Sequence, residues 1–360
     1  MEKISADGRA ETGERKGRDA HGLTYPFDAP PEPGTTREIV PGIHWLRMPL
    51  PFALDHINLW LLEEEEGWTI VDTGVDSSLV RGYWEQIFET VLKGKPVTRV
   101  IVTHLHPDHV GLAGWLTRKW QTDLWMSRTD YLLCKTLVLD TGRPAPDEAI
   151  RFYRAAGFND RQLEAYRKRF GGFGERVSQM PDQFHRLQDG DELQIGGRVW
   201  RVVVGSGHAP EHICLHCPDL KVFLSGDQVL PRISSNVSVH PTEPFENPLQ
   251  DWIDSCARLR AGLPDDVLVL PAHNLPFFGL HNRLTSLIDG HEHGLKRLTE
   301  VLAQPKRAVD VFSALFKRRI NSDLFFMATG ESLAHLNCLL ARGVIRRELD
   351  ADGVNWYQTI

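Results

Sequence analysis

Short apolar runs separated by polar turns dominate the first part of the chain. β-Branched and aromatic residues are dense over residues 43–50, 56–62 and 68–71, and polar residues 64–67 separate the last two runs. Runs of this length and composition predict strands, and the polar turn predicts a hairpin. We therefore expect a sheet that begins near residue 43.

Helical spacing follows the hairpin. Residues 77–92 predict a helix, because apolar residues recur on one face. These residues are Leu79, Tyr83, Ile87 and Val91. The apolar run 99–102 then predicts a buried strand, and residues 110–120 predict the next helix. Strands that alternate with helices indicate an α/β protein.

Helical patterns without strands fill the middle of the chain. They cover residues 131–139, 147–156 and 160–170. We interpret the stretch 128–183 around them as a helical insertion. Its tyrosines are expected to pack rather than to take part in chemistry; they are Tyr131, Tyr153 and Tyr166.

Apolar runs return after the insertion and predict the second half of the sheet structure. The predicted strands are residues 185–187, 192–195, 198–204, 212–216 and 222–224. A further strand is predicted over residues 266–270, and helices are predicted over residues 248–263 and 280–302. We expect these helices to pack on the outside of the sheet.

The end of the chain has a different order of elements. Three helical patterns precede two β-rich runs around a turn. The helical patterns are residues 309–317, 322–329 and 332–342, and the β-rich runs are residues 344–349 and 354–359. Helices followed by a hairpin is the order of a winged helix. The predicted domains are a flexible or surface-draped arm at 1–36, a main domain at 37–304 and a winged-helix-like domain at 305–360.

Composition narrows the classes of partner. The 360 residues carry 41 basic and 48 acidic side chains, a net charge of -7, so no basic field attracts nucleic acid or an anionic membrane. No apolar run is long enough to span a membrane and the N-terminus does not resemble a signal peptide. We expect a cytoplasmic protein with a small-molecule substrate; the terminal domain could bind nucleic acid, form a homodimer or wall the active site.

Cysteines do not indicate a disulfide framework. The chain has five, and Cys214 and Cys217 form a CxxC pattern inside a predicted strand. Residues three apart in a strand face opposite sides. We therefore interpret this pair as ordinary strand residues rather than as a metal or redox motif.

The candidate chemistry is concentrated directly after the strand at 99–102. His104 and His106 alternate by two, so an extended backbone turns both imidazoles to one side. Pro107 ends the strand, and Asp108 and His109 follow at the start of a helix. Two adjacent groups of ligands result, and imidazole with carboxylate suits zinc, iron, manganese or cobalt.

The pattern HxHxDH resembles the metallo-β-lactamase superfamily, in particular its glyoxalase II-like members. That resemblance requires further ligands downstream, and His208, Asp227 and His273 each follow a predicted strand. It implies a four-layer αββα sandwich. It also implies that His104, His106 and His208 hold one divalent ion, that Asp108, His109 and His273 hold a second, and that Asp227 bridges them.

The same resemblance implies the activity. We expect a hydrolase with two Zn²⁺ ions, with manganese or iron as the alternatives, and with a metal-bridging hydroxide as nucleophile. Asp108 is expected to orient the hydroxide or pass on its proton. Asp72, in Asp72-Thr73-Gly74, is expected to support a ligand without coordinating, and His212 to form hydrogen bonds near the site.

The substrate stays open at this point. A small ester, thioester or lactone is the leading hypothesis, with the insertion lying over the site and lining the pocket. One alternative is a ribonuclease that resembles lactamase-beta-2-like proteins and uses the winged helix. The other is a mononuclear iron persulfide dioxygenase, which uses fewer of the seven ligands. Residues 231–248, just after Asp227, are expected to contribute to specificity.

Overall fold

The computed structural model describes residues 19, 22–51, 54–317, 319–322 and 324–360. Most of the predicted N-terminal arm, residues 1–18 and 20–21, lies outside the described residues. The end of the arm that is described is packed, because Leu23 is fully buried and the backbone of Thr24 pairs with that of Phe278. This part of the arm is therefore draped over the main domain.

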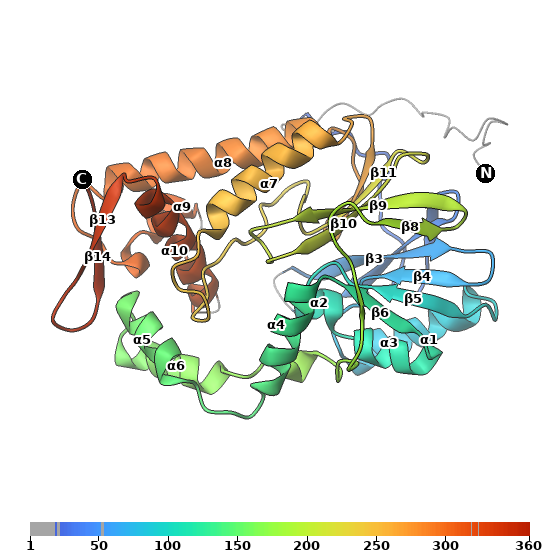
Figure 1. The fold of residues 1–360 in the computed structure, drawn as a ribbon, viewed down its shortest axis with the longest axis horizontal. Helices are drawn as coiled ribbons and strands as arrows, with labels where there is room; N and C mark the ends of the chain where they lie inside the picture. The colour runs from blue at the N-terminus through green and yellow to red at the C-terminus, as the bar shows by residue number, and fades with distance from the viewer. Residues whose placement is uncertain (1–18, 20–21, 52–53, 318, 323) are drawn as a thin grey trace.

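The first of two stacked sheets contains seven strands (Figure 1). In spatial order these are β1 (Arg37–Val40), β2 (Ile43–Pro49), β3 (His56–Glu63), β4 (Trp68–Val71), β5 (Val97–Ile101), β6 (Asp123–Met126) and β7 (His185–Arg186). The pairs from β1 to β4 are antiparallel, and those from β4 to β7 are parallel. The parallel half aligns the carboxyl ends of β4 and β5, where the candidate ligands begin.

The second sheet contains five strands. They are β8 (Glu192–Ile195), β9 (Arg198–Gly205), β10 (His212–Cys217), β11 (Val222–Gly226) and β12 (Leu268–Pro271), in the spatial order β12-β11-β10-β9-β8. Only β11 and β12 are paired in parallel. Their carboxyl ends point to the same edge as those of β4 and β5.

Helices cover the outer face of each sheet, and the two inner faces pack on one another. On the first sheet lie α1 (Ser78–Thr90) and α3 (Ala113–Trp120); on the second lie α7 (Pro248–Gly262) and α8 (Leu280–Val301). Trp45, Trp60 and Trp200 belong to the buried cluster between the sheets. The structure thus confirms the predicted αββα sandwich.

The continuous apolar run of β3 reflects burial on both faces. Leu59 and Leu61 belong to the cluster under α1, whereas Trp60 and Leu62 face the second sheet. A strand that is covered on both sides needs no alternation of apolar and polar residues. This is why composition, rather than alternation, identified the strand.

The helices of the predicted insertion pack in two places, because Tyr131 of the first helix lies in the cluster under the first sheet and Tyr153 of the second lies in the cluster of the terminal domain. These helices are α4 (Arg128–Leu139), α5 (Asp147–Ala155) and α6 (Asp160–Arg169), followed by the short η1 (Gly174–Arg176). Tyr153 lies 5.7 Å from Phe326 between ring centroids, and Phe158 lies 5.0 Å from Phe325. The tyrosines of the insertion pack, as expected.

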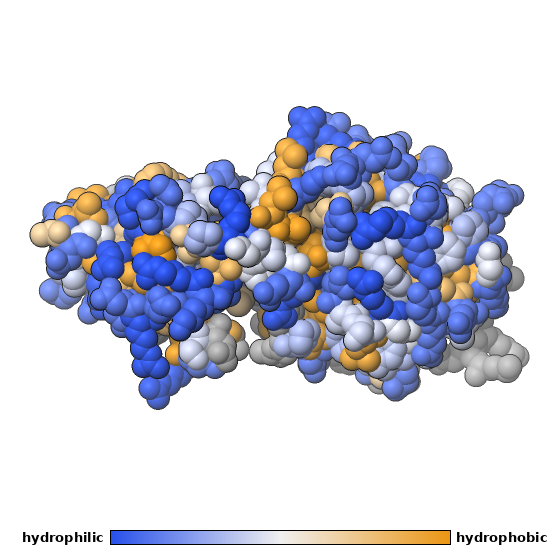
Figure 2. Space-filling model, turned by 90° about the horizontal axis from the view of Figure 1, so that it is seen from below, coloured by the Kyte–Doolittle hydropathy of each residue, from blue (hydrophilic) through white to orange (hydrophobic). Residues whose placement is uncertain are grey.

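The surface seen from below carries a stripe of apolar side chains between hydrophilic surfaces (Figure 2). Two leucines of α4, Leu132 and Leu139, are exposed.

The terminal segment consists of helices and a hairpin. The elements are η2 (Ala308–Asp310), α9 (Phe312–Leu315), α10 (Phe325–Ala341), β13 (Ile345–Leu349) and β14 (Asn355–Thr359). The prediction of separate helices at 322–329 and 332–342 was wrong, because α10 continues through Gly330 and Glu331. Gly330 lies inside this helix at a point where the helix packs closely against Ser238 of a neighbouring loop.

Three further boundaries differ from the predictions. Residues 185–186 form β7 of the first sheet, not part of the second, because they pair with the unpredicted β6. The unpredicted β1 extends the other edge. The predicted helix at 110–120 is divided into α2 (Pro107–Val110) and α3, because Gly111 approaches the backbone of Gly74 too closely for a side chain: an added Cβ would lie 2.5 Å from the Gly74 carbonyl oxygen.

The cysteine interpretation is confirmed, since Cys214 packs with the outer cluster and Cys217 with the cluster between the sheets. All five cysteines are buried and free. Among the helices of the described residues, none has the length and apolar character needed to cross a membrane.

Candidate metal centre

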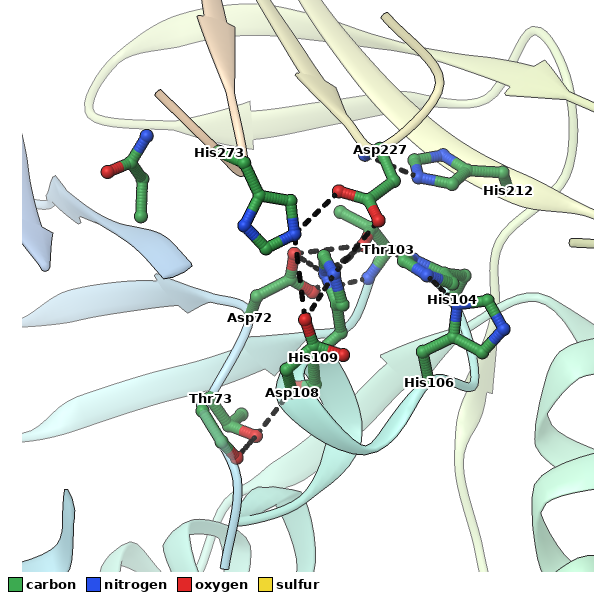
Figure 3. A network of polar contacts seen from close by, with 12 residues as sticks. Asp72, Thr73, Thr103, His104, His106, Asp108, His109, His212, Asp227 and His273 are labelled. Carbon is green, nitrogen blue, oxygen red and sulfur yellow. Dashed lines mark hydrogen bonds and ion pairs between the residues drawn. The ribbon is translucent and has the colours of Figure 1, made fainter. Parts of the chain in front are cut away.

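The seven predicted ligands meet at one edge of the sandwich, although they come from four separate strand ends. His104 and His106 follow β5, and Asp108 and His109 begin α2. His208 follows β9, while the other two ligands follow β11 and β12; these are Asp227 and His273. Figure 3 shows Asp227 and His273 pointing from the second sheet toward Asp108 and His109 of the first.

The first group consists of His104, His106, His208 and Asp227. His104 Nε2 lies 2.8 Å from His106 Nδ1 and 3.2 Å from His208 Nε2. His208 Nε2 lies 3.3 Å from Asp227 Oδ2. All four ligand atoms lie within 4.8 Å of one another. Three imidazole nitrogens and a carboxylate oxygen that converge in this way form a donor set for a divalent ion.

The second group consists of Asp108, His109 and His273, whose ligand atoms also lie within 4.8 Å of one another. Asp108 Oδ2 lies 3.6 Å from both His109 Nε2 and His273 Nε2. Asp227 reaches this group as well: its Oδ1 lies 3.2 Å from His273 Nε2, and its Oδ2 lies 3.7 Å from His109 Nε2. Asp227 therefore stands between the two groups.

Hydrogen bonds on the far side of three of the five imidazole rings fix which nitrogen faces the centre. His109 Nδ1 donates to Asp72 Oδ2 at 2.7 Å, which leaves Nε2 free. His208 Nδ1 donates to the Asn236 carbonyl oxygen at 2.7 Å, and His273 Nδ1 donates to the His56 carbonyl oxygen at 2.7 Å. Such acceptors select the tautomer that presents a lone pair to a metal.

The electrostatics of these residues fit divalent ions. His109 Nε2 is buried and has no hydrogen-bond partner, although it faces two carboxylates. Burial by itself lowers the pKa of His109, but Asp72, Asp108 and Asp227 together hold it well above its usual range. Burial and neighbouring imidazoles hold the pKa values of His104 and His106 well below theirs, so these rings are neutral. Neutral imidazoles beside excess carboxylate charge are what a cation requires.

Asp72 supports the centre as predicted. Besides accepting from His109, it accepts from the backbone N–H of Thr103 at 2.8 Å and from the Thr103 hydroxyl. Its backbone has a φ of 62°, a left-handed conformation that turns the carboxylate toward the end of β5. Asp72 thereby holds both His109 and the residue before His104.

We expect Asp72→Asn to weaken metal binding by about 10- to 100-fold. The amide can still accept from Thr103, but its NH₂ group would face His109 Nδ1–H and favour the wrong tautomer. Competition with a chromogenic chelator would measure the dissociation constants. The control is Asp76→Asn in the same turn, where the carboxylate pairs with Arg81 instead; equal metal affinity of the two variants would contradict this role.

Asp130 was not predicted. It is fully buried and accepts from the Leu105 N–H at 3.0 Å and from the Glu211 N–H at 2.9 Å, so it joins the loop of His106 to the loop of His208. Burial raises its pKa to about 6, against the effect of these hydrogen bonds. In the sequence, an acidic residue three positions after Ser127 is typical of the first turn of a helix. Nothing in the sequence therefore indicated that Asp130 has another role.

Two other supporting residues complete the surroundings of the first group. His212 Nε2 accepts from the Asp227 backbone N–H at 3.0 Å, and the ring stacks on His104. His212 therefore forms hydrogen bonds near the site, as predicted. Asn236 was not predicted, because it acts through its main-chain carbonyl, which sequence identity does not reveal.

Comparisons with known proteins agree with this geometry. The Metallo-beta-lactamase superfamily matches residues 53–273, and the family described as Metallo-beta-lactamase-like, C-terminal domain matches residues 295–360. The chain therefore belongs to the metallo-β-lactamase superfamily. With its two His/Asp groups, it is a metal-dependent hydrolase of that superfamily.

Individual relatives extend the match to nearly the whole chain. A crystal structure of a beta-lactamase domain protein from Burkholderia ambifaria is 42% identical, with a TM-score of 0.86, and the match covers 94% of this chain and 99% of that one. The probable metallo-hydrolase YqjP of Bacillus subtilis is 23% identical over 86% of this chain and 95% of its own length. The human acyl-coenzyme A thioesterase MBLAC2 is 25% identical over 64% of this chain and 78% of its own length.

Proposed function

We propose that the protein is a dinuclear hydrolase of small acyl substrates, most specifically thioesters and esters, including lactones. The observation that carries the proposal is the position of Asp227 between two otherwise separate ligand groups. Support for acyl chemistry comes from a relative whose name describes an acyl-coenzyme A thioesterase. A hydroxyacylglutathione hydrolase also matches, at 28% identity over 97 residues.

The ligand residues would hold two divalent ions, which we propose to be Zn²⁺. Such ions lower the pKa of a bound water toward neutrality and polarise a carbonyl oxygen. His104, His106 and His208 would bind the first ion, and Asp108, His109 and His273 the second, with Asp227 binding both. Asp72 and the Asn236 and His56 carbonyls would keep the imidazoles of His109, His208 and His273 oriented toward the ions.

Asp108 is the ligand residue best placed to handle a proton. Its side chain is 17% exposed, compared with 10% for Asp227 and 0% for His109. Among these three side chains, Asp108 is therefore the one most accessible to an attacking water. We propose that Asp108 orients that water and carries its proton toward the leaving group.

The second ligand group favours hydrolysis over the iron dioxygenase alternative. A mononuclear site would use fewer of the seven candidate ligands and would leave the group of Asp108, His109 and His273 without a metal. Here His273 Nε2 is aimed at Asp227 and Asp108, and its Nδ1 is fixed by a backbone carbonyl. The net charge of -7 disfavours the ribonuclease alternative.

A substrate panel tests the proposal. We expect kcat/KM for a short acyl-coenzyme A thioester or a p-nitrophenyl ester to exceed that for bis(p-nitrophenyl) phosphate by about 100-fold or more, a difference of about 3 kcal/mol in transition-state stabilisation. The His106→Ala variant serves as the blank for each substrate. Preferred cleavage of the phosphodiester, or oxygen consumption with a persulfide, would contradict the proposal.

A further inference from the structure

The loop that connects Asp227 to α7 lies between the metal centre and the terminal domain. Its side chains Val237 and Val239 are buried in the same cluster as Leu333 and Ala334 of α10. The Asn337 side chain of α10 also donates to carbonyl oxygens farther along this loop. The loop is therefore packed on the terminal domain along much of its length.

One hydrogen-bonded path runs from α10 to a candidate ligand. His208 Nδ1 donates to the Asn236 carbonyl oxygen at 2.7 Å, and Asn236 Nδ2 donates to Glu331 Oε2 at 2.9 Å. The Ser238 hydroxyl donates to Asn236 Oδ1 at 2.6 Å. Both polar atoms of the Asn236 side chain are therefore held by hydrogen bonds. This restrains residue 236 so that its main-chain carbonyl keeps accepting from His208 Nδ1, which leaves Nε2 of His208 as the free nitrogen.

Gly330 brings α10 close enough for this path. Its carbonyl oxygen accepts from the Val239 N–H at 3.1 Å, although it lies inside a helix. A Cβ added at Gly330 would lie 2.7 Å from Ser238 Oγ and 2.8 Å from Ser238 Cβ, shorter than real contacts. The residue next to Glu331 therefore has to be glycine for the loop to keep its position.

A second buried path holds the same loop from its other end. The Ser234 hydroxyl lies 3.0 Å from His291 Nε2 of α8, and His291 Nδ1 lies 3.4 Å from His335 Nε2. His335 Nδ1 donates to the Glu331 carbonyl oxygen at 2.8 Å. Glu331 thus contributes its side chain to one path and its backbone to the other.

We propose that Glu331 and Gly330 of the terminal domain are positioning residues of the metal centre, acting on His208 through Asn236. The terminal domain then forms part of the support of the site. This proposal rests on the ligand role proposed for His208. It does not depend on which substrate the enzyme cleaves, because it concerns the orientation of an imidazole.

Metal affinity of full-length variants tests it. We expect Glu331→Ala to raise the dissociation constant of one of two Zn²⁺ ions by about 10-fold and to lower kcat more than it changes KM. Glu331→Gln keeps an oxygen that can accept from Asn236 and should bind Zn²⁺ within about twofold of the wild type. Gly330→Ala should weaken the binding of the same ion, even though alanine ordinarily stabilises a helix more than glycine does.

The matched control is Glu292→Ala, which removes an ion pair between α8 and Arg342 of the terminal domain without touching the loop. Glu292→Ala should leave both Zn²⁺ dissociation constants unchanged. The melting temperature of this variant without metal shows how much stability is lost when a contact of the terminal domain is removed away from the loop. Equal Zn²⁺ affinity of Glu331→Ala and Glu292→Ala would overturn the positioning role. Full retention of two Zn²⁺ in His208→Ala would instead overturn the ligand role on which it rests, whatever substrate is found.

Discussion

Asp227→Ala is expected to lower kcat/KM by about 10³-fold or more and to reduce the bound metal, while the fold is retained. Asp227 reaches both ligand groups, with Oδ2 3.3 Å from His208 Nε2 and Oδ1 3.2 Å from His273 Nε2. Its removal leaves Asp108 as the carboxylate that faces the Nε2 atoms of His109 and His273. Steady-state kinetics and metal analysis of the same preparation measure both effects.

Asp266→Ala is the control for this variant. Asp266 lies just before β12 and forms an exposed ion pair with Lys221, which lies just before β11. The control should keep full activity and metal content. Circular dichroism should be the same for both variants, which separates loss of the site from loss of the fold. Wild-type turnover by Asp227→Ala would refute the assignment of the site.

Removal of metal by a chelator is expected to abolish activity and to lower the melting temperature by about 5 °C or more. The nitrogens of His104, His106 and His208 converge at 2.8 to 3.2 Å from one another, an arrangement that a shared cation stabilises. His109 Nε2 is buried without a hydrogen-bond partner. Bound metal should therefore stabilise the folded state.

Calorimetric scans of chelated and reconstituted protein measure this effect. Two equivalents of Zn²⁺ should restore both activity and melting temperature, and Mg²⁺ should not, because the donors are mainly imidazoles. The control is the His104→Ala/Asp227→Ala double variant. Chelation should lower its melting temperature less than it lowers that of the wild type. An unchanged wild-type melting temperature and activity after complete metal removal would be the contrary result.

The main part of the fold could be predicted because its signals are local. Strands such as β3 and β4 have dense apolar runs, and α1 has clear helical spacing. The convergence of the candidate ligands could be predicted because they follow strand ends, in the order that the resemblance requires. Parallel pairing of β4 with β5 and of β11 with β12 then brings those ends together.

What could not be predicted depends on tertiary contacts. The short β6 begins at Asp123 and is defined by its pairing with β5, so β7 was placed in the wrong sheet. The continuity of α10 through Gly330 depends on the loop packed against it. Asp130 acts by accepting backbone hydrogens from two distant loops, and nothing in its local sequence indicates those partners.

The terminal domain shows the same distinction. Its order of helices and hairpin was recognisable, and residues 295–360 match a family described as the C-terminal domain of metallo-beta-lactamase-like proteins. Its packing on the loop after Asp227 was not recognisable, because the hydrogen bonds of Asn236 and Asn337 join residues more than 90 positions apart. The supporting role that we propose for the domain rests on this packing.

The metal content of protein purified without added metal tests the central claim most directly. We predict about two divalent ions per chain, mainly zinc, falling to about one in His273→Ala. A single iron per chain that is unaffected by His273→Ala would contradict the dinuclear centre. It would show that Asp108, His109 and His273 do not hold a metal and would favour oxygen chemistry over hydrolysis.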